Sequence, residues 1–401
     1  MNDQSTQAGS APQRAILFTA FEPSGDSHAS SVIAAIRQQA PDIPVYAWGG
    51  PAMEQAGATI IQQTSTDGAM GAGGLSKILE HIRITRDLKT WLRSHPEVAV
   101  HVPVDSPAAN FPICKATKPA GCRVVHLVAP QLWAWAPWRI GKLRRLTDLV
   151  LCLLPFEEPY FLNRNVPAKF IGHPVIAEHI KVLAQDDVTA TRHPLPETAG
   201  PKIALLPGSR SGEINRHARD MAAVAQRLAL THPQTSAVFA AANEHAATRI
   251  ESQIESIKSN RDGQAVDFTV TTGSLSSVLR WADLVLVCSG TATLDVACHG
   301  VPMVVMYKLN PLSWNLVGRW LLTTRHIALP NIIADRRIVP EIIPYYQSLD
   351  RITHEAAQLL DNPDLAEAQL ENLTEIVKLF RDSDPGQLAA GHILDQMQRR
   401  R

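Results

Sequence analysis

The stretch from Ile203 to Ile214, IALLPGSRSGEI, decides the fold. Its first four residues are apolar, which is typical of a short strand buried on both faces of a parallel sheet. Pro207 and Gly208 end that strand, and a helical pattern follows. A strand, a tight turn and a helix form the repeating unit of an open α/β sheet, whose ligands bind beyond the carboxyl ends of the strands.

Ser209 and Arg210 stand at that carboxyl end, with Glu213 three residues further on. A guanidinium group is planar and permanently charged, so it can donate two parallel hydrogen bonds to a diphosphate. We therefore predict a phosphate-binding loop at Gly208, Ser209 and Arg210. The alternative is an ordinary strand-to-helix loop with a solvated arginine.

The N-terminal half shows the same alternation of strands and helices. Phe21–Ser30 is predicted as a loop before a helix that begins at Val32, and residues 75–92 show the apolar spacing of an amphipathic helix. The loop has neither G-x-G-x-x-G nor a P-loop ending, so it does not indicate a dinucleotide. The predicted strands are Ala15–Thr19, Val45–Trp48, Ala58–Ile61, Val98–Val104, Arg123–Val128, Leu149–Leu154 and Lys169–Ile171.

A second alternating set follows a polar stretch with two prolines. The predicted fold class is therefore α/β: two Rossmann-like, doubly wound domains that face each other across a cleft, with a helical C-terminal tail. The strands of the second set are predicted at Ile203–Leu206, Ser236–Ala240, Ala265–Thr269, Leu284–Cys288 and Met303–Met306. The predicted boundaries are a disordered tail at 1–14, domains at 15–184 and 201–345, a linker at 185–200 and helices at 346–401, broken near Asn362-Pro363 and Asp384-Pro385.

Composition excludes several classes of protein. The 401 residues carry 38 Lys+Arg and 38 Asp+Glu, and this balance argues against a general nucleic-acid binder. The 5 cysteines form no C-x-x-C pair and complete no zinc site, so we expect no metal and a reducing compartment. The polar N-terminus does not resemble a signal peptide, and no apolar run approaches the ~20 residues that span a bilayer.

A second phosphate-binding edge is predicted after the strand Leu284–Cys288. Ser289, Gly290 and Thr291 precede a helix, and free N–H groups at a helix start with a hydroxyl cap can bind an anion. Asp295, one turn into that helix, can accept a hydrogen bond from a ribose hydroxyl. The alternatives are a plain N-cap for Ser289 and complementation of the helix dipole for Asp295.

Asp105 ends the strand Val98–Val104 and is the candidate general base. An acid at this position can also be a turn residue. Glu22 and Asp26 lie at a neighbouring strand end and compete for the role.

Aromatic and basic residues are interleaved in QLWAWAPWRIGKLRRL, which holds Trp133, Trp135 and Trp138. Such a pattern is typical of a surface that meets lipid head groups. A second candidate is the segment from Trp314 to Leu322. The alternative for both is packing in a core or an interface.

Several stretches together resemble the lipid-A-disaccharide synthase family, which has the GT-B fold. The matching stretches lie in family order along nearly the whole chain: Glu22–Asp26, Ala69–Gly71, Val104-Asp105, Ala129–Trp135, Thr147–Glu157, Phe170–His173, Leu205–Arg210 with Glu213, Ser289–Thr291, Pro302–Tyr307 and Leu329–Asn331. The sequence departs from the family pattern in the opening Phe21–Asp26, at Ser106–Asn110, after Gly71, and at Asp295, where the family has Glu.

The resemblance implies an inverting transfer from a UDP-diacylglucosamine donor to an acylated glucosamine 1-phosphate acceptor, without cofactor or metal. It implies that Asp105 is the essential acid. It also implies a substrate or UDP site that includes Ser24, Gly25, Asp26, Gly208, Ser209, Arg210, Glu213, Ser289, Gly290, Thr291, Asp295 and Asn331.

The resemblance further suggests a homodimer and a cytoplasmic enzyme peripheral to the inner membrane, with no nucleic-acid partner. Two alternatives stay open at this point. One is another UDP-sugar enzyme of the same architecture, such as a hexosamine epimerase or a different lipid glycosyltransferase. The other is an inactive paralogue that binds lipid or nucleotide.

Overall fold

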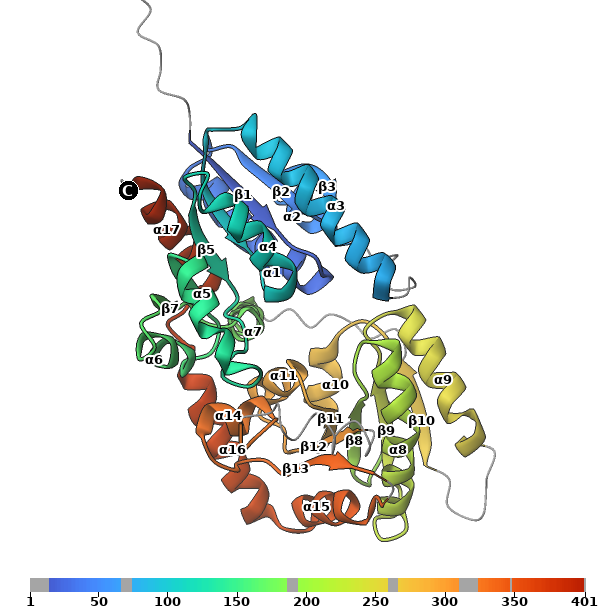
Figure 1. The fold of residues 1–401 in the computed structure, drawn as a ribbon. Coiled ribbons are helices and arrows are strands. Elements are labelled where there is room, and N and C mark those ends of the chain that lie inside the picture. Colours follow the sequence, from blue (N-terminus) through green and yellow to red (C-terminus); the bar gives the residue numbers. More distant parts are fainter. Residues whose placement is uncertain are drawn as a thin grey trace, which may run out of the picture. The chain divides into compact units, whose positions relative to one another are not determined.

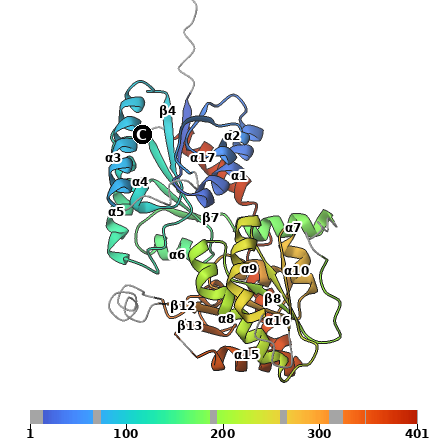
Figure 2. The ribbon, with the colours of Figure 1, turned by 90° about the vertical axis from the view of Figure 1, so that its right-hand side faces the viewer.

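The computed structural model describes residues 14–65, 74–185, 194–258, 266–309, 324–346 and 348–399. The chain divides into two compact units. The first unit contains Met1–Pro174 and Ser383–Arg401, and the second contains Val175–Asp382. Figures 1 and 2 show the ribbon of both units.

The first unit is built on a seven-stranded parallel sheet with the order β3-β2-β1-β4-β5-β6-β7. The order reverses between β1 and β4, so the strands wind outward in both directions from this pair. The strands are β1 (Ala15–Thr19), β2 (Val45–Gly49), β3 (Thr59–Gln63), β4 (Val98–Pro103), β5 (Arg123–Leu127), β6 (Leu149–Cys152) and β7 (Ala168–Phe170).

Helices cover both faces of this sheet, and alternate residues of β1 pack beneath the helices on opposite faces. Ile16 and Phe18 pack in the core beneath α1 (Pro23–Gln39), α2 (Pro51–Gln55) and α17 (Pro385–Gln398). Ala15 and Leu17 pack in the core beneath α3 (Gly74–Arg93) and α4 (Pro107–Thr117). A third core cluster joins α4 to α5 (Ile140–Leu146) and α6 (Glu157–Leu162). All five residues of β1 are buried, as expected for a central parallel strand.

The second unit repeats the plan with a six-stranded parallel sheet of order β10-β9-β8-β11-β12-β13. Here the order reverses between β8 and β11. The strands are β8 (Lys202–Leu206), β9 (Ser236–Ala240), β10 (Asp267–Thr271), β11 (Leu284–Cys288), β12 (Met303–Lys308) and β13 (Glu341–Tyr345). The helices are α7 (Pro174–Gln185), α8 (Ser211–Ala229), α9 (Glu244–Lys258), α10 (Leu275–Trp281), α11 (Ala292–His299), α14 (Leu329–Ala334), α15 (Asp350–Asp361) and α16 (Pro363–Lys378).

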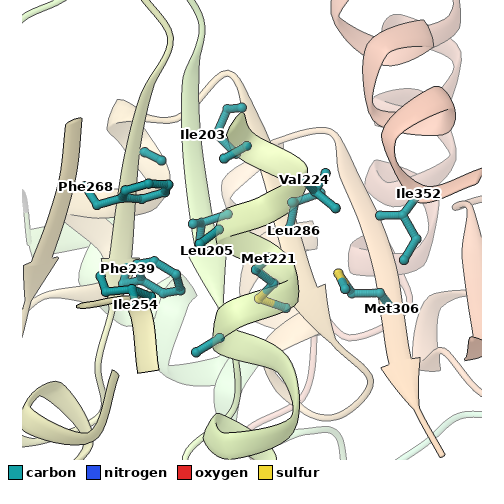
Figure 3. Packing of buried hydrophobic residues seen from close by; sticks show 14 of the residues in the cluster. Ile203, Leu205, Met221, Val224, Phe239, Ile254, Phe268, Leu286, Met306 and Ile352 are labelled. Carbon is teal, nitrogen blue, oxygen red and sulfur yellow. The ribbon is translucent and has the colours of Figure 1, made fainter. Parts of the chain in front are cut away.

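The largest part of the second unit's core lies between this sheet and helices α8, α9 and α15. Figure 3 shows Met221 and Val224 of α8 packed over Leu205 and Leu286 of the central strands. This close packing fixes the start of α8 against the end of β8, which is where the sequence predicts a ligand.

The structure confirms the α/β class, the two parallel sheets and the helical tail. The predicted loop Phe21–Ser30 is wrong, because α1 already begins at Pro23, a favoured first helical residue. The strand predicted at Ala265–Thr269 is β10, two residues later along the chain. The sequence reading also missed β13, whose Pro344 obscures its strand pattern at the edge of the sheet.

The predicted breaks in the C-terminal helices are confirmed, and each has a capping residue followed by proline. The Asn362 side chain accepts from the Leu365 N–H at 3.2 Å, and that of Asp384 accepts from the Gln387 N–H at 3.2 Å. The last break also separates the units. α15 and α16 pack in the second unit, whereas α17 returns to the first and packs against α1, β4 and β5.

Candidate functional site

Each sheet has one point where its strand order reverses, and the loops that follow the two diverging strands leave a natural ligand site there. In the first unit these loops follow β1 and β4, and they carry Glu22 and Asp105. In the second unit they follow β8 and β11, and they carry Arg210 and Ser289. The acid and the phosphate-binding residues predicted from sequence therefore lie at the reversal points of their own sheets.

The two loops of the second unit that are predicted to bind phosphate are neighbours. Leu206 of β8 pairs with Val287 of β11 in parallel register, so the residues after both strands emerge at the same edge. Gly208, Ser209 and Arg210 follow one strand, and Ser289, Gly290 and Thr291 follow the other. The structure thus brings together the two loops that the sequence assigned to one anion site.

Arg210 stands at the start of α8, held by Glu213. The Arg210 N–H donates to Glu213 Oε2 at 3.3 Å, and the guanidinium Nη1 lies 3.3 Å from Oε1. The Arg210 side chain stays 66% exposed, whereas that of Glu213 is 19% exposed. Gly208 has φ +102°, and a Cβ there would collide with Glu213 Oε2. The glycine lets Glu213 fold back on the loop, and Glu213 orients a guanidinium that remains open to a ligand.

The loop after β11 is shaped by Gly290 and anchored by Ser289. Gly290 has φ +153°, a conformation that favours glycine, and both Gly290 and Thr291 are exposed before α11 begins. The Ser289 hydroxyl donates to the Ile327 carbonyl at 3.2 Å, so it fixes the loop within the chain. The exposed backbone at Gly290 and Thr291 is therefore better placed for an anion than the Ser289 hydroxyl.

Asp295 lies in the first turn of α11. Burial, followed by the negative charge of Glu178, raises the pKa of Asp295 to about 6. A carboxyl group with this pKa can donate or accept a hydrogen bond near neutral pH. That property suits the ribose contact expected for it, which stays a prediction.

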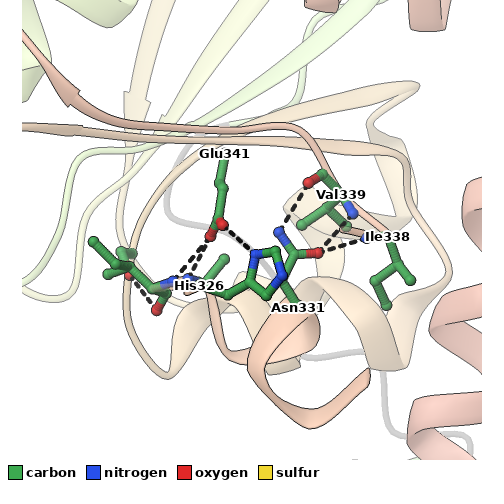
Figure 4. Close-up of polar contacts among 8 residues, drawn as sticks. His326, Asn331, Ile338, Val339 and Glu341 are labelled. Carbon is green, nitrogen blue, oxygen red and sulfur yellow. Dashed lines mark hydrogen bonds and ion pairs between the residues drawn. The ribbon is translucent and has the colours of Figure 1, made fainter. Parts of the chain in front are cut away.

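Asn331 is fully buried, and its amide is used within the chain. Its Oδ1 accepts from Ile338 N at 2.7 Å and Val339 N at 2.9 Å, and its Nδ2 donates to the Val339 carbonyl at 3.0 Å. Glu341 holds the segment just before α14, because it accepts from Ile327 N, Ala328 N and His326 Nδ1 (Figure 4). Asn331 therefore shapes the segment beside Ser289, and its expected contact with the donor stays a prediction.

Asp105 sits in a strained turn after β4. Asp105 and Ser106 have φ +46° and +30°, and neither is glycine. The Asp105 N–H donates to the Leu127 carbonyl at 2.9 Å, while Asn110 Nδ2 donates to the Asp105 carbonyl at 3.1 Å. The backbone of this acid is thus held on both sides, as expected for a side chain that must point in one direction.

The environment of Asp105 favours a base. Burial raises its pKa above the ordinary value of an aspartate, and the negative charge of Glu22 raises it further against the Ser106 N–H, which lowers it. Glu22 is close by, since its Oε1 accepts from the Ser106 hydroxyl at 3.0 Å. A carboxylate of raised pKa is a stronger proton acceptor.

The residues Ser24, Gly25 and Asp26 form the first turn of α1, where Gly25 and Asp26 are buried. The Asp26 carboxylate accepts from Gly50 N at 2.9 Å, Ala52 N at 3.0 Å and Met53 N at 3.2 Å. These bonds hold the start of α2. The Asp26 carboxylate is therefore used within the fold, and the role of Asp105 as base stays a prediction.

The three tryptophans of the W-A-W region differ in exposure. Trp133 is buried, and its Nε1–H donates to Glu157 Oε1 at 2.9 Å. Burial raises the pKa of Glu157 to about 7 against three N–H donors. Trp135 and Trp138 are 42% and 67% exposed. Packing thus accounts for Trp133, and the lipid interpretation is left with the other two. The segments Trp314–Leu322 and Ala69–Gly71 lie outside the described residues.

Several residues of the site were not identified from sequence. Asn110 lies in a helical pattern, and Glu341 lies in an unrecognised strand. The bond that joins Asn110 to Thr19 spans 91 positions, so no local signal reveals it. Glu341 bonds residues 13 to 15 positions earlier, which lie before a strand that was not predicted. Within the described ranges, no group of three His, Cys, Asp or Glu side chains is arranged to hold a metal ion. In the same ranges, no helix is long and apolar enough to cross a membrane.

Known proteins resemble this chain over nearly its whole length. The sequence profile described as lipid-A-disaccharide synthetase matches residues 16–386. A lipid-A-disaccharide synthase of Myxococcus xanthus is 32% identical over 95% of this chain and 97% of its own length. One of Pseudomonas putida is 33% identical over 94% and 97%.

Solved structures agree on the fold. A UDP-GlcNAc 2-epimerase from Neisseria meningitidis, bound to UDP-GlcNAc, has a TM-score of 0.62 at 12% identity and covers 95% of this chain and 99% of its own. The glycotransferase of kitacinnamycin has a TM-score of 0.57 at 17% identity, with coverage of 96% and 100%. These likenesses show the GT-B architecture alone. The sequence matches show more: the chain belongs to the lipid-A-disaccharide synthase family of glycosyltransferases.

Proposed function

We propose that this protein joins UDP-2,3-diacylglucosamine to 2,3-diacylglucosamine 1-phosphate, giving lipid A disaccharide 1-phosphate and UDP. Family membership supports the reaction. One structural observation supports the residues: an exposed guanidinium and a helix start share one edge of the second unit, while a half-buried acid stands at the reversal point of the first.

The donor diphosphate is held by Arg210 and by the backbone of Gly290 and Thr291. As the bond between the sugar C1 and the phosphate oxygen breaks, negative charge grows on UDP. A fixed guanidinium and free N–H groups stabilise that charge. Glu213 keeps the guanidinium in place, since it is bonded to both the Arg210 backbone and its side chain.

Asp105 acts on the acceptor. Its carboxylate takes the proton of the 6-hydroxyl as the oxygen forms a bond to C1 of the donor and UDP departs with the bonding electrons. Attack on the face opposite the leaving group inverts the configuration at C1. No covalent enzyme intermediate is needed, so one carboxylate is sufficient.

The test compares Asp105→Ala with Arg210→Ala in a UDP-release assay, with mass spectrometry of the lipid product. Loss of the base is expected to lower kcat by roughly 10²-fold or more. Arg210→Ala is expected to weaken UDP binding measured by calorimetry as well as turnover. An Asp105→Ala enzyme with near-normal turnover contradicts the assignment of the base. Conversion of UDP-GlcNAc to an epimeric UDP-sugar without acylated acceptor contradicts the reaction and favours an epimerase.

We also propose that the first unit docks on the inner-membrane surface from the cytoplasmic side through Trp135 and Trp138. Both are exposed beside the exposed cations Arg139, Arg144 and Arg145, which suits anionic head groups. Co-sedimentation with phosphatidylglycerol vesicles is expected to be lower for Trp138→Ala than for wild type, although the variant keeps the buried Trp133. Equal binding of wild type and Trp138→Ala to the vesicles contradicts the proposed docking surface. The homodimer stays a prediction that light scattering tests.

A further inference from the structure

A chain of four buried polar side chains lies behind the turn that carries Asp105. Thr19, His101, Asn110 and Thr117 are each 0% exposed, and they come from β1, β4 and α4. Buried polar groups cost free energy unless they are paired, so a connected set of four needs a reason.

The direction of every hydrogen bond among these four side chains follows from their chemistry. Asn110 faces the carbonyls of Val104 at 2.9 Å and Asp105 at 3.1 Å, and carbonyls only accept, so the Asn110 NH₂ group points at them. Its Oδ1 then accepts the hydroxyl proton of Thr19 at 2.7 Å. The Thr19 oxygen, having donated its only proton, accepts from His101 Nε2 at 2.9 Å.

His101 completes the chain as a neutral ring. Burial, followed by the nearby His126, lowers the pKa of His101 to about 3. With its proton on Nε2, the Nδ1 atom is an acceptor, and the Thr117 hydroxyl donates to it at 2.9 Å. Each group thus has one role only, and the Asn110 amide cannot rotate by 180° without breaking several bonds at once.

We propose that Asn110 is the positioning residue for Asp105, and that Thr19 and His101 lock its amide in the orientation that clamps the strained turn. This inference rests on the proposed role of Asp105 as base. The turn needs such a clamp because Asp105 and Ser106 both hold positive φ without being glycine. The clamp acts on the carbonyls of Val104 and Asp105, so it sets the direction in which the carboxylate leaves the backbone.

The experiment is a double-mutant cycle between Asn110→Ala and Asp105→Ala, read as kcat and KM for both substrates. In the wild-type background, Asn110→Ala is expected to lower kcat by about 10- to 10²-fold and to leave KM within about threefold, because a misplaced base affects the chemical step. In the Asp105→Ala background the same change is expected to cost nothing further, because the group it positions is gone.

The outcomes separate the two hypotheses. Asp105→Ala alone tests the base, and near-normal turnover overturns that role and the positioning role with it. If Asp105→Ala is slow and Asn110→Ala keeps wild-type kcat, only the positioning role is overturned. The positioning role is also overturned if Asn110→Ala lowers kcat by the same factor in the wild-type and Asp105→Ala backgrounds, because the loss then does not depend on Asp105.

A second pair of variants keeps the test decisive if Asn110→Ala does not fold. Thr19→Val removes the lock and leaves the volume nearly unchanged, and it is expected to lower kcat by about tenfold. Thr19→Ser keeps the hydroxyl and is expected to restore kcat. The matched control is Thr147→Val, which removes a buried hydroxyl bonded to the Leu143 carbonyl at the end of α5. Equal kcat losses in Thr19→Val, Thr19→Ser and Thr147→Val overturn the proposal.

Discussion

The pKa of Asp105, the proposed base, depends on a few neighbouring groups. Burial raises its pKa, Glu22 raises it further, and the Ser106 N–H partly offsets both. A general base works only while it is ionised, so the rate falls as the pH falls through its pKa. The midpoint of that fall therefore reports the charges around the turn.

We predict that Glu22→Gln moves the acid limb of kcat/KM to lower pH. The substitution removes a negative charge that disfavours ionised Asp105, so the pKa of Asp105 falls. The glutamine Oε1 can still accept from the Ser106 hydroxyl, which bonds Glu22 at 3.0 Å. The measurement is the pH profile of kcat/KM for wild type and variant.

The control for this profile is Glu54→Gln, which removes the charge of an exposed carboxylate on α2 in the same unit. Its acid limb should match that of wild type. An unchanged midpoint in Glu22→Gln, or an equal shift in both variants, would contradict the local electrostatic explanation.

At the scale of the element, the start of α8 joins a structural role to the proposed binding role of Arg210. Glu213 satisfies the Arg210 N–H, which has no partner inside the helix, and it also holds the guanidinium. This double use is possible only because Gly208 leaves room, since a Cβ there would lie 2.8 Å from the Cβ of Glu213.

We predict that Gly208→Ala raises the donor KM and lowers the free energy of unfolding by about 1–3 kcal/mol. The residue has φ +102°, and the new methyl group would push Glu213 away from Arg210. Gly212→Ala is the matched control in the first turn of α8, where a Cβ meets no atom within 4 Å. Denaturant unfolding and donor titration check both variants. If the two alanine variants behave alike, the Gly208 contact has no role in holding the loop.

At the scale of the whole molecule, the chain crosses between its units twice, and the second crossing places neighbouring helices in different units. α16 packs against α11 and α14 of the second unit. α17 follows after a short turn, and its Ala389, Ala390 and Ile393 are buried in the core of the first unit beside α1.

We predict that Ile393→Ala and Ile376→Ala loosen different units although only 17 positions separate them, counted as 393 − 376. Each removes a buried side chain and is expected to cost about 2–5 kcal/mol. Hydrogen exchange read by mass spectrometry should rise in α1, β4 and β5 for Ile393→Ala, and in α11 and α14 for Ile376→Ala. Exchange rising in the same unit for both variants would contradict the division of the tail.

Much of this protein was predictable from its sequence because the signals are local. Short apolar runs ending in Gly, Pro or Ser located the central strands of both sheets, and Asn362-Pro363 and Asp384-Pro385 located the helix breaks. The adjacency of the loops after β8 and β11 followed from the same signals, since parallel strands end at one edge. Asp105 was predictable as a residue at a strand end, but the bonds that hold Asp26 to the start of α2 were not, because their donors lie 24 and 26 positions away along the chain.

The sequence by itself determined the α/β class, the pairing of strand ends with polar loops, and the family. Only the tertiary structure decided that α17 belongs to the first unit, that Asn331 faces inward, and that Asn110, Thr19 and His101 form one chain behind Asp105. The physical reason is range. Strand and turn preferences act over a few residues, whereas Thr19 and Asn110 are 91 positions apart and have no influence on each other until the sheet has formed.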